Sequence, residues 1–315
     1  MIAKRGLRME AGSMISISED NEMTIRYDMH LHSSFSTDSD ASAEEMAFHA
    51  QRLGLDGICF TEHMDLDYPK GYFPEDPDAF CADPDQVLNK VLHLRKTVRA
   101  RKAFLPGASE KNALFPLWIG FGLEFGMQPH LSDRFHQIAR NYPLDFIVAS
   151  QHLVSSLDPY YPEVWEHKNP EDLIEEYYRE MLANLKTIED WDTLAHMDYI
   201  IRYIPGRKEQ VYDSISNHAQ IIDEILCHVI ERGKCLEVNT AGYKYGLGQP
   251  NPAPSILRRY RELGGENITI GSDAHAPEHI AISFDQTAGL LTDIGFTHYC
   301  LFERRKMYPL RFHSV

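Results

Sequence analysis

Short apolar segments alternate with helical patterns along most of this chain of 315 residues. The apolar segments resemble buried strands, and helix-start signals follow many of them. Ser42 and Glu45 form a capping-box pattern that predicts a helix ending near Leu53, and Asn169 before Pro170 predicts another helix start. Alternating strands and helices favour parallel strands joined by helical crossovers, so we predict an α/β barrel with seven such strands.

One apolar segment ends in the pattern His30-Leu31-His32, and Asp38 follows six residues later. Residues i and i+2 of a strand point to the same side, so the two imidazoles can turn toward one point. Two neutral imidazoles and a carboxylate suit a metal ion such as zinc, manganese or iron. The alternative is a strand end that carries two polar histidines and no metal.

Polar side chains follow all seven predicted strands, and most of them are of metal-ligand types. The carboxyl ends of barrel strands gather at one face, where active sites lie. Each single histidine could be a structural residue, but the set supplies enough ligands for two or three ions. These strand-end residues are His30, His32, His63, Glu124, His152, His196, Asp273 and His275.

The composition excludes several classes of protein. A net charge of −16 argues against a surface that binds nucleic acid or anionic membranes. The five cysteines are scattered without a C-x-x-C pair, which is typical of reduced thiols in the cytoplasm. No apolar run is long enough to span a membrane, and residues 1–22 lack the apolar core of a secretory signal. We therefore predict a cytoplasmic protein whose oligomeric state the sequence leaves open.

Three parts of the chain fall outside the regular alternation. Residues 1–22 are predicted to be an N-terminal extension, and 23–315 to form the barrel domain. Residues 64–116 are predicted to be an insertion on the working face of the barrel, where the carboxyl ends of the strands lie. A last strand is predicted near 299–302. Acidic side chains at the start of the insertion are expected to be solvated, although some could contact a cationic substrate. They are Asp65, Asp67, Glu75, Asp76 and Asp78.

Several metal ions a few ångströms apart can share a water, lower its pKa and neutralise phosphate oxygens. This is the chemistry of phosphoester hydrolysis. The sequence has no P-loop, no G-x-S-x-G nucleophile motif and no thiol in a catalytic motif. These features favour direct attack on phosphorus by metal-bound hydroxide over a covalent intermediate.

The ordered motifs identify a family. H-x-H, Asp38, T-E-H, G-L-E, S-Q-H, A-H-M-D and S-D-A-H resemble the polymerase-and-histidinol-phosphatase (PHP) superfamily from about Arg26 onward. The segments 145–147 and 157–161, with H-M-D-Y-I-I-R-Y and E-V-N-T-A-G, resemble its histidinol-phosphatase branch. The resemblance implies a single-domain, distorted seven-stranded (β/α) barrel, similar to a TIM barrel, with three divalent transition-metal ions.

The resemblance also implies ligands, motif by motif. The first metal would be held by His30, His32, Glu124 and Asp273. Glu124 would bridge to the second metal, which His152 and His196 would also hold. The third metal would be held by Asp38, His63 and His275. Some relatives have a histidine in place of Asp38, which leaves the identity of the third metal open.

Two basic residues match the phosphate-binding positions of the branch. Arg202 follows His196 by six residues, where the branch carries an arginine. Lys244 stands where relatives often carry arginine, and lysine binds phosphate as a point charge without the bidentate fork. The structural alternatives are an Arg202 that pairs with a nearby carboxylate and a solvated Lys244.

The predicted function is hydrolysis of L-histidinol phosphate to L-histidinol and phosphate in histidine biosynthesis. Glu124 would bridge two ions, and a metal-held acid near Asp38 or His275 would protonate the leaving group, although the sequence does not choose the group. One alternative is a PHP phosphoesterase acting on another small phosphomonoester or a nucleotide. The other is a metal-binding regulatory protein without turnover. The expected partner is a small phosphate ester, with no nucleic acid and no membrane.

Overall fold

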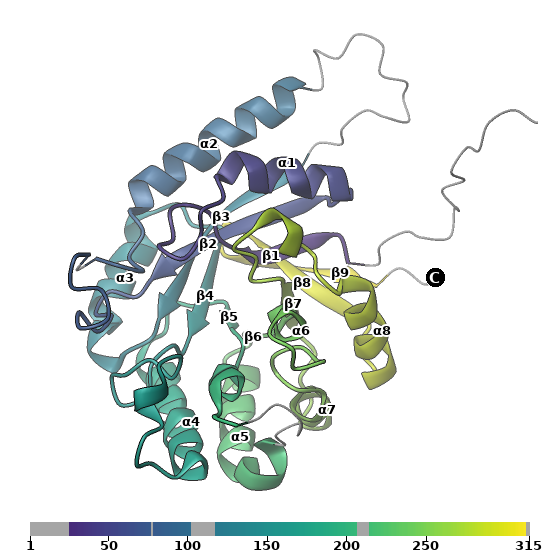
Figure 1. Ribbon diagram of the computed structural model, residues 1–315. Helices are drawn as coiled ribbons and strands as arrows, with labels where there is room; N and C mark the ends of the chain where they lie inside the picture. Colours follow the sequence, from purple (N-terminus) through teal and green to yellow (C-terminus); the bar gives the residue numbers. More distant parts are fainter. Residues whose placement is uncertain (1–24, 77, 102–116, 207–213, 313–315) are drawn as a thin grey trace, which may run out of the picture.

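A parallel sheet of seven strands curls into the barrel that the sequence predicts (Figure 1). The computed structural model describes residues 25–76, 78–101, 117–206 and 214–312. The strands pair in chain order, each with the next one along the sequence. They are β1 Tyr27–Leu31, β2 Gly57–Met64, β3 Trp118–Gly126, β4 Phe146–Ser150, β5 Thr193–Leu194, β6 Cys235–Asn239 and β7 Ile268–Gly271.

The first and last strands meet at their carboxyl ends. The backbone N–H of His32 donates to the carbonyl of Ala274 over 2.9 Å, and that of Asp273 donates to the carbonyl of His30 over 2.7 Å. A parallel bridge between Leu31 and Ala274 lies at the same place. The contact between β1 and β7 therefore lies beside the H-x-H and S-D-A-H motifs.

Helices surround the strands on the outside of the barrel (Figure 1). Their inward faces pack against the outer face of the sheet in one large apolar cluster. They are α1 Ala43–Leu53, α2 Pro84–Arg101, α3 Ser132–Asn141, α4 Pro170–Thr187, α5 Ser214–Glu231, α7 Pro254–Glu262 and α8 Phe284–Ile294. The short α6 Ala241–Lys244 instead follows β6 directly, at the carboxyl end of that strand. Short 3-10 helices follow several strands: η2 Pro129–Leu131, η3 Pro162–Val164, η4 Tyr199–Tyr203 and η5 Pro277–His279.

The predicted helix caps are confirmed. The side chain of Ser42 accepts a hydrogen bond from the backbone of Glu45, whose carboxylate accepts one in return from the backbone N–H of Ser42. Gly54 ends α1 with φ of +80°, a conformation that glycine adopts without a Cβ clash. Asn169 caps α4, with Pro170 at its first position. The N-caps at Ser42 and Asn169 therefore end the loops that follow β1 and β4.

A hairpin covers the end of the barrel opposite the predicted site. It consists of β8 His298–Glu303, which the sequence predicts, and β9 Lys306–Arg311, which it does not. Its turn is anchored at the amino ends of β4 and β5. The backbone of Arg304 donates to the carboxylate of Asp145 over 3.0 Å, and Arg305 pairs with the buried carboxylate of Asp192. Asp192 also accepts from the backbone N–H of Ile147 over 2.9 Å.

The loop after β2 returns to its own strand. Asp65 N donates to the carbonyl of Phe80 over 2.8 Å, and Ala82 N donates to that of His63 over 2.9 Å. This part of the predicted insertion therefore lies at the carboxyl end of β2, on the working face. The predicted extension 1–22 and residues 102–116 of the insertion lie outside the described residues. In the described parts of the chain, no helix is both long and apolar enough to cross a membrane.

Candidate metal centre

The nine predicted ligands converge at the carboxyl ends of the strands. A pocket of about 410 Å³ opens there, lined by six of the eight strand-end residues and by Asp38. His30 and His32 lie fully buried beside it. Seven of the nine residues are less than a tenth exposed: His30, His32, His63, Glu124, His152, His196 and Asp273.

The first predicted set forms a compact group. Nε2 of His30 lies 3.2 Å from Nε2 of His32, and Glu124 Oε2 lies 3.4 Å from each of these nitrogens. Asp273 Oδ1 lies 3.4 Å from His32 Nε2 and 3.9 Å from His30 Nε2. One ligand atom each from His30, His32 and Asp273 lies within the spacing of a single metal site.

The second predicted set meets the other oxygen of Glu124. Oε1 of Glu124 lies 3.1 Å from His152 Nε2 and 3.0 Å from His196 Nε2. Ser150 at the end of β4 donates its hydroxyl to the same oxygen over 2.6 Å. The two oxygens of this carboxylate therefore face two groups of imidazoles, which is the arrangement of a bridging ligand.

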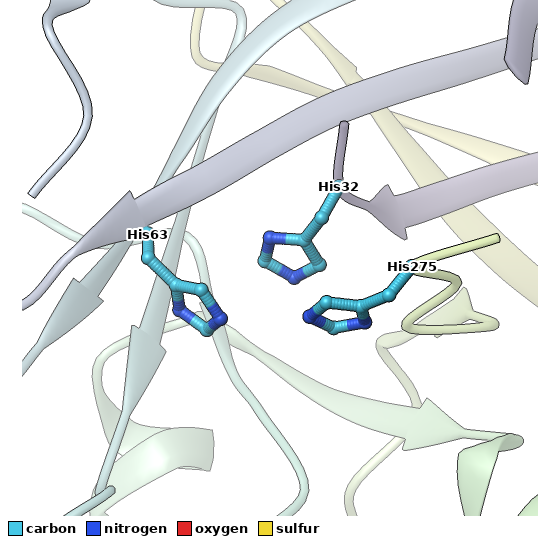
Figure 2. A group of neighbouring side chains, drawn as sticks. All are labelled: His32, His63 and His275. Atoms are coloured by element: carbon cyan, nitrogen blue, oxygen red, sulfur yellow. The ribbon is translucent and has the colours of Figure 1, made fainter. Parts of the chain in front are cut away.

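The third predicted set lies at the more exposed side. Figure 2 shows the imidazoles of His32, His63 and His275 gathered around one space, from the end of β1, from β2 and from the loop after β7. The His32 ring stacks on the other two with centroid distances of 4.3 and 4.2 Å. Asp38 Oδ2 lies 3.0 Å from His275 Nε2 and 3.6 Å from His63 Nε2.

Hydrogen bonds define the tautomers of the two H-x-H imidazoles. His30 Nδ1 lies 2.6 Å from the buried carboxylate of Glu237 and donates to it. Ser36 donates its hydroxyl proton to Glu62 over 2.6 Å, so it can only accept from His32 Nδ1, 3.2 Å away. When both rings are neutral, as metal ligands must be, both Nε2 atoms carry lone pairs that face each other. A cation between them would relieve this repulsion, so the side chains fit a metal ion.

The pKa values of the ligand histidines are shifted in both directions. Burial, followed by the neighbouring His275 and His63, lowers the pKa of His32 to about 3, so its imidazole stays neutral. Burial also lowers the pKa of His196. Burial alone would raise the pKa of Glu124, but the surrounding histidines, His30 first, hold it well below its usual value. Burial alone would lower the pKa values of His30, His63 and His152, but neighbouring carboxylates outweigh it. They raise the pKa of His152 to about 10 and those of His30 and His63 well above the usual value. These three imidazoles would release a proton on binding a metal, because metal ligands must be deprotonated.

The prediction that Asp65 is solvated is wrong. Asp65 is 5% exposed, and one of its oxygens accepts from His152 Nδ1 over 2.8 Å. The other lies 3.5 Å from His63 Nδ1. Asp65 follows His63 by two positions, so strand alternation would have placed both side chains on one face. The other acidic residues of that prediction are exposed: Asp67, Glu75, Asp76 and Asp78.

The two predicted phosphate-binding residues line the same pocket. Arg202, on η4, donates from Nε to Asn251 over 2.9 Å and from Nη2 to Asn239 over 3.1 Å. Its guanidinium lies over the ring of Tyr245, 4.8 Å from the centroid. Lys244 ends α6, and burial lowers the pKa of its amine. Sequence analysis missed the two asparagines and Glu237, although the E-V-N pattern places Glu237 and Asn239 on one strand face.

Aromatic side chains and one further carboxylate form the rest of the pocket wall. Asp158 is 7% exposed and accepts from the hydroxyl of Tyr68 over 2.6 Å and from the backbone of Tyr160 over 2.8 Å. It belongs to the segment 157–161 that the sequence singled out. The aromatic lining residues are Tyr68, Phe73, Phe80, Tyr160, Tyr161, Tyr199, Tyr203 and Tyr245.

Comparisons with known proteins agree on one family. The sequence model of the family described as "PHP domain" matches residues 28–241. The chain is 32% identical over 282 residues to a probable histidinol-phosphatase of Clostridium acetobutylicum, covering 89% of this chain and 98% of the relative. It is 27% identical over 283 residues to the histidinol-phosphatase of Lactococcus lactis, covering 90% and 96%.

Two solved structures share the fold. The crystal structure of the Lactococcus lactis histidinol phosphate phosphatase, complexed with zinc, L-histidinol and phosphate, matches with a TM-score of 0.77. The sequences are 25% identical, and the match covers 90% of this chain and 98% of the other. A putative histidinol phosphatase of Listeria monocytogenes matches with a TM-score of 0.63 at 20% identity, covering 82% and 99%.

The position of Asp65 generates a prediction about Gly126 at the end of β3. A Cβ at residue 126 would overlap the carboxylate of Asp65, so Gly126→Ala must displace the group that accepts from His152. Loss of such an outer partner typically weakens metal binding about 10- to 100-fold. We expect Gly126→Ala to bind zinc that much more weakly, measured by elemental analysis after equilibration in buffers of fixed free zinc.

Gly289 in α8 provides the matched control. A Cβ there meets no atom within 4 Å, and alanine is favoured over glycine in a helix by about 0.5–1 kcal/mol. Gly289→Ala is expected to keep the zinc affinity of the unchanged protein. Equal zinc affinities for the two variants would contradict the role assigned to Asp65.

Proposed function

Since this chain belongs to the PHP domain family, we propose that it is a metal-dependent phosphomonoesterase that hydrolyses L-histidinol phosphate to L-histidinol and phosphate. One observation carries the proposal. The fold matches, over nearly the whole of both chains, a histidinol phosphate phosphatase whose structure contains zinc, L-histidinol and phosphate. The product of the proposed reaction would serve histidine biosynthesis.

The proposed cofactors are three divalent transition-metal ions, which would be zinc, manganese or iron. His30, His32, Glu124 and Asp273 would hold the first, Glu124, His152 and His196 the second, and Asp38, His63 and His275 the third. Such ions neutralise phosphoryl oxygens and lower the pKa of water. The convergence of these side chains and the facing lone pairs of His30 and His32 support this assignment.

The protein itself would orient the phosphate and manage the leaving group. Arg202 is held by two asparagines, and its guanidinium lines the pocket beside Asp273, with Nη1 3.4 Å from Oδ2. A fixed guanidinium can stabilise the developing charge on phosphoryl oxygens without reorganisation during the reaction. Lys244 would add a second positive charge. Asp38 Oδ2 and His275 Nε2 lie 3.0 Å apart at the more exposed side, and a metal-held acid near them would give a proton to the departing alkoxide.

Part of the pocket lining suits the other end of this substrate. L-Histidinol phosphate carries an ammonium group and an imidazole opposite its phosphate. Asp158 offers a buried carboxylate among aromatic rings that can stack on an imidazole or contact a cation. Positive groups for the phosphate and a carboxylate for the ammonium group would select and orient such a substrate.

A substrate comparison tests the proposal. Purified zinc-loaded protein is expected to release phosphate from L-histidinol phosphate with a higher kcat/KM than from p-nitrophenyl phosphate or simple sugar phosphates. It should also restore growth without histidine to a bacterial strain that lacks its histidinol phosphatase. Equal activity on all esters without rescue would remove the substrate assignment. No phosphate release from any ester would contradict enzymatic function altogether.

A second prediction separates the two basic residues. Losing a hydrogen bond to a charged group typically costs about 1.5–3 kcal/mol, which corresponds to roughly a 10- to 100-fold loss. Arg202→Ala is therefore expected to lower kcat/KM at least that much while zinc content is retained, and Lys244→Ala to lower it less. The control is Arg232→Ala, which removes an arginine paired with Glu189 on the surface. Unchanged kinetics in Arg202→Ala would assign Arg202 a structural role.

A further inference from the structure

Two neighbouring polar residues of β6 link the metal-type ligands to the arginine. Glu237 and Asn239 are two positions apart on the strand, so their side chains point to the same side, into the barrel. They are 1% and 0% exposed. Neither is among the predicted ligands.

Glu237 uses both of its oxygens. Oε1 accepts from His30 Nδ1 over 2.6 Å. Oε2 accepts from the backbone N–H of His196 over 3.0 Å and from Asn239 Nδ2 over 3.1 Å. One buried carboxylate thus contacts residues of the first and second predicted metal sets.

Asn239 continues the connection to the arginine. Its Oδ1 accepts from Arg202 Nη2 over 3.1 Å, while its Nδ2 also donates to Asp273 Oδ2 over 3.3 Å. Its backbone exchanges two hydrogen bonds with Asn251, of 2.7 and 2.8 Å. The side chain of Asn251 accepts from Arg202 Nε. The guanidinium is therefore held from β6 through two asparagines.

We propose that Glu237 and Asn239 act as one positioning unit that presents His30 Nε2 to the metal and the Arg202 guanidinium to the phosphate. The inference rests on the proposed function, because it takes the pocket to bind metal ions and a phosphate group. Neither residue is among those that line the pocket. Glu237 acts through the tautomer of His30, and Asn239 acts through the orientation of Arg202.

The geometry requires a carboxylate at position 237. An amide that accepts from His30 would turn its NH2 group toward two other donors, His196 N and Asn239 Nδ2. An amide in the opposite orientation would face His30 Nδ1 with a donor and favour the tautomer whose Nε2 is protonated and cannot bind metal.

The opposing strand leaves room for this carboxylate. A Cβ at Gly271 of β7 would lie 2.8 Å from Glu237 Oε1 and would overlap the Cβ of His30. A glycine at this position is therefore required for His30 and Glu237 to approach each other. This observation is independent of the hydrogen bonds and supports the same pairing.

Zinc binding by Glu237→Gln tests the first half of the proposal. The zinc-loaded full-length variant is equilibrated in buffers of fixed free zinc, and bound zinc is counted by elemental analysis. We expect zinc affinity to fall about 10- to 100-fold, with Glu237→Asp, which keeps the charge, falling less. Wild-type zinc affinity in Glu237→Gln would overturn the assignment.

Asp192→Asn is the matched control. It also neutralises a buried carboxylate that accepts from a backbone N–H, but at the opposite end of the barrel. It is expected to lower the thermal unfolding temperature and leave zinc affinity unchanged. Zinc loss as large in Asp192→Asn as in Glu237→Gln would mean that general destabilisation is the cause, which would also overturn the proposal.

Phosphate binding by Asn239→Ala tests the second half. Inorganic phosphate is titrated into zinc-loaded protein by calorimetry. We expect zinc to be retained and phosphate affinity to fall roughly tenfold or more, because Arg202 loses its Asn239 anchor. Unchanged phosphate affinity would overturn this half. Both readouts are independent of which ester is the substrate, so they separate this proposal from the substrate assignment.

Discussion

The structure depends on holding several buried ionisable groups within contact of one another. The Nε2 atoms of His30 and His32 lie 3.2 Å apart, beside the carboxylate of Glu124. Removing such groups from water is costly unless they are paired or bind a metal. Ions bound here would therefore contribute to folding as well as to catalysis. This constraint explains why so many surrounding residues form hydrogen bonds that hold these side chains in place.

The residues that form these hydrogen bonds include three further buried carboxylates outside the predicted ligand set. Glu62 holds the loop after β1 through the hydroxyls of Ser33 and Ser36, Asp65 orients His152, and Glu237 orients His30. Gly126 and Gly271 leave the space that the last two carboxylates occupy. The barrel brings the strand ends together, and these outer contacts determine which nitrogen of His30, His32 and His152 faces the centre.

Local sequence patterns predicted the features of the fold and site that depend on residues close together in the sequence. The capping box at Ser42 set the start of α1, and the strand-end positions of the ligands indicated one shared face. The features that the sequence did not predict depend on contacts between residues far apart in the sequence. Asp65 is buried because a histidine 87 positions later donates to it, and no local pattern distinguishes it from its solvated neighbour Asp67 except its spacing from His63. Strand β9 contains a proline and forms only as the partner of β8.

The central claim is that these side chains form a centre for three metal ions. Anomalous diffraction at the zinc absorption edge, from crystals of the zinc-loaded protein, tests it most directly. The account predicts three peaks, each about 2.0–2.2 Å from the imidazole nitrogens and carboxylate oxygens of one set, with Glu124 between two of them. No peak within bonding distance of His30, His32 and Glu124 in fully loaded crystals would contradict it.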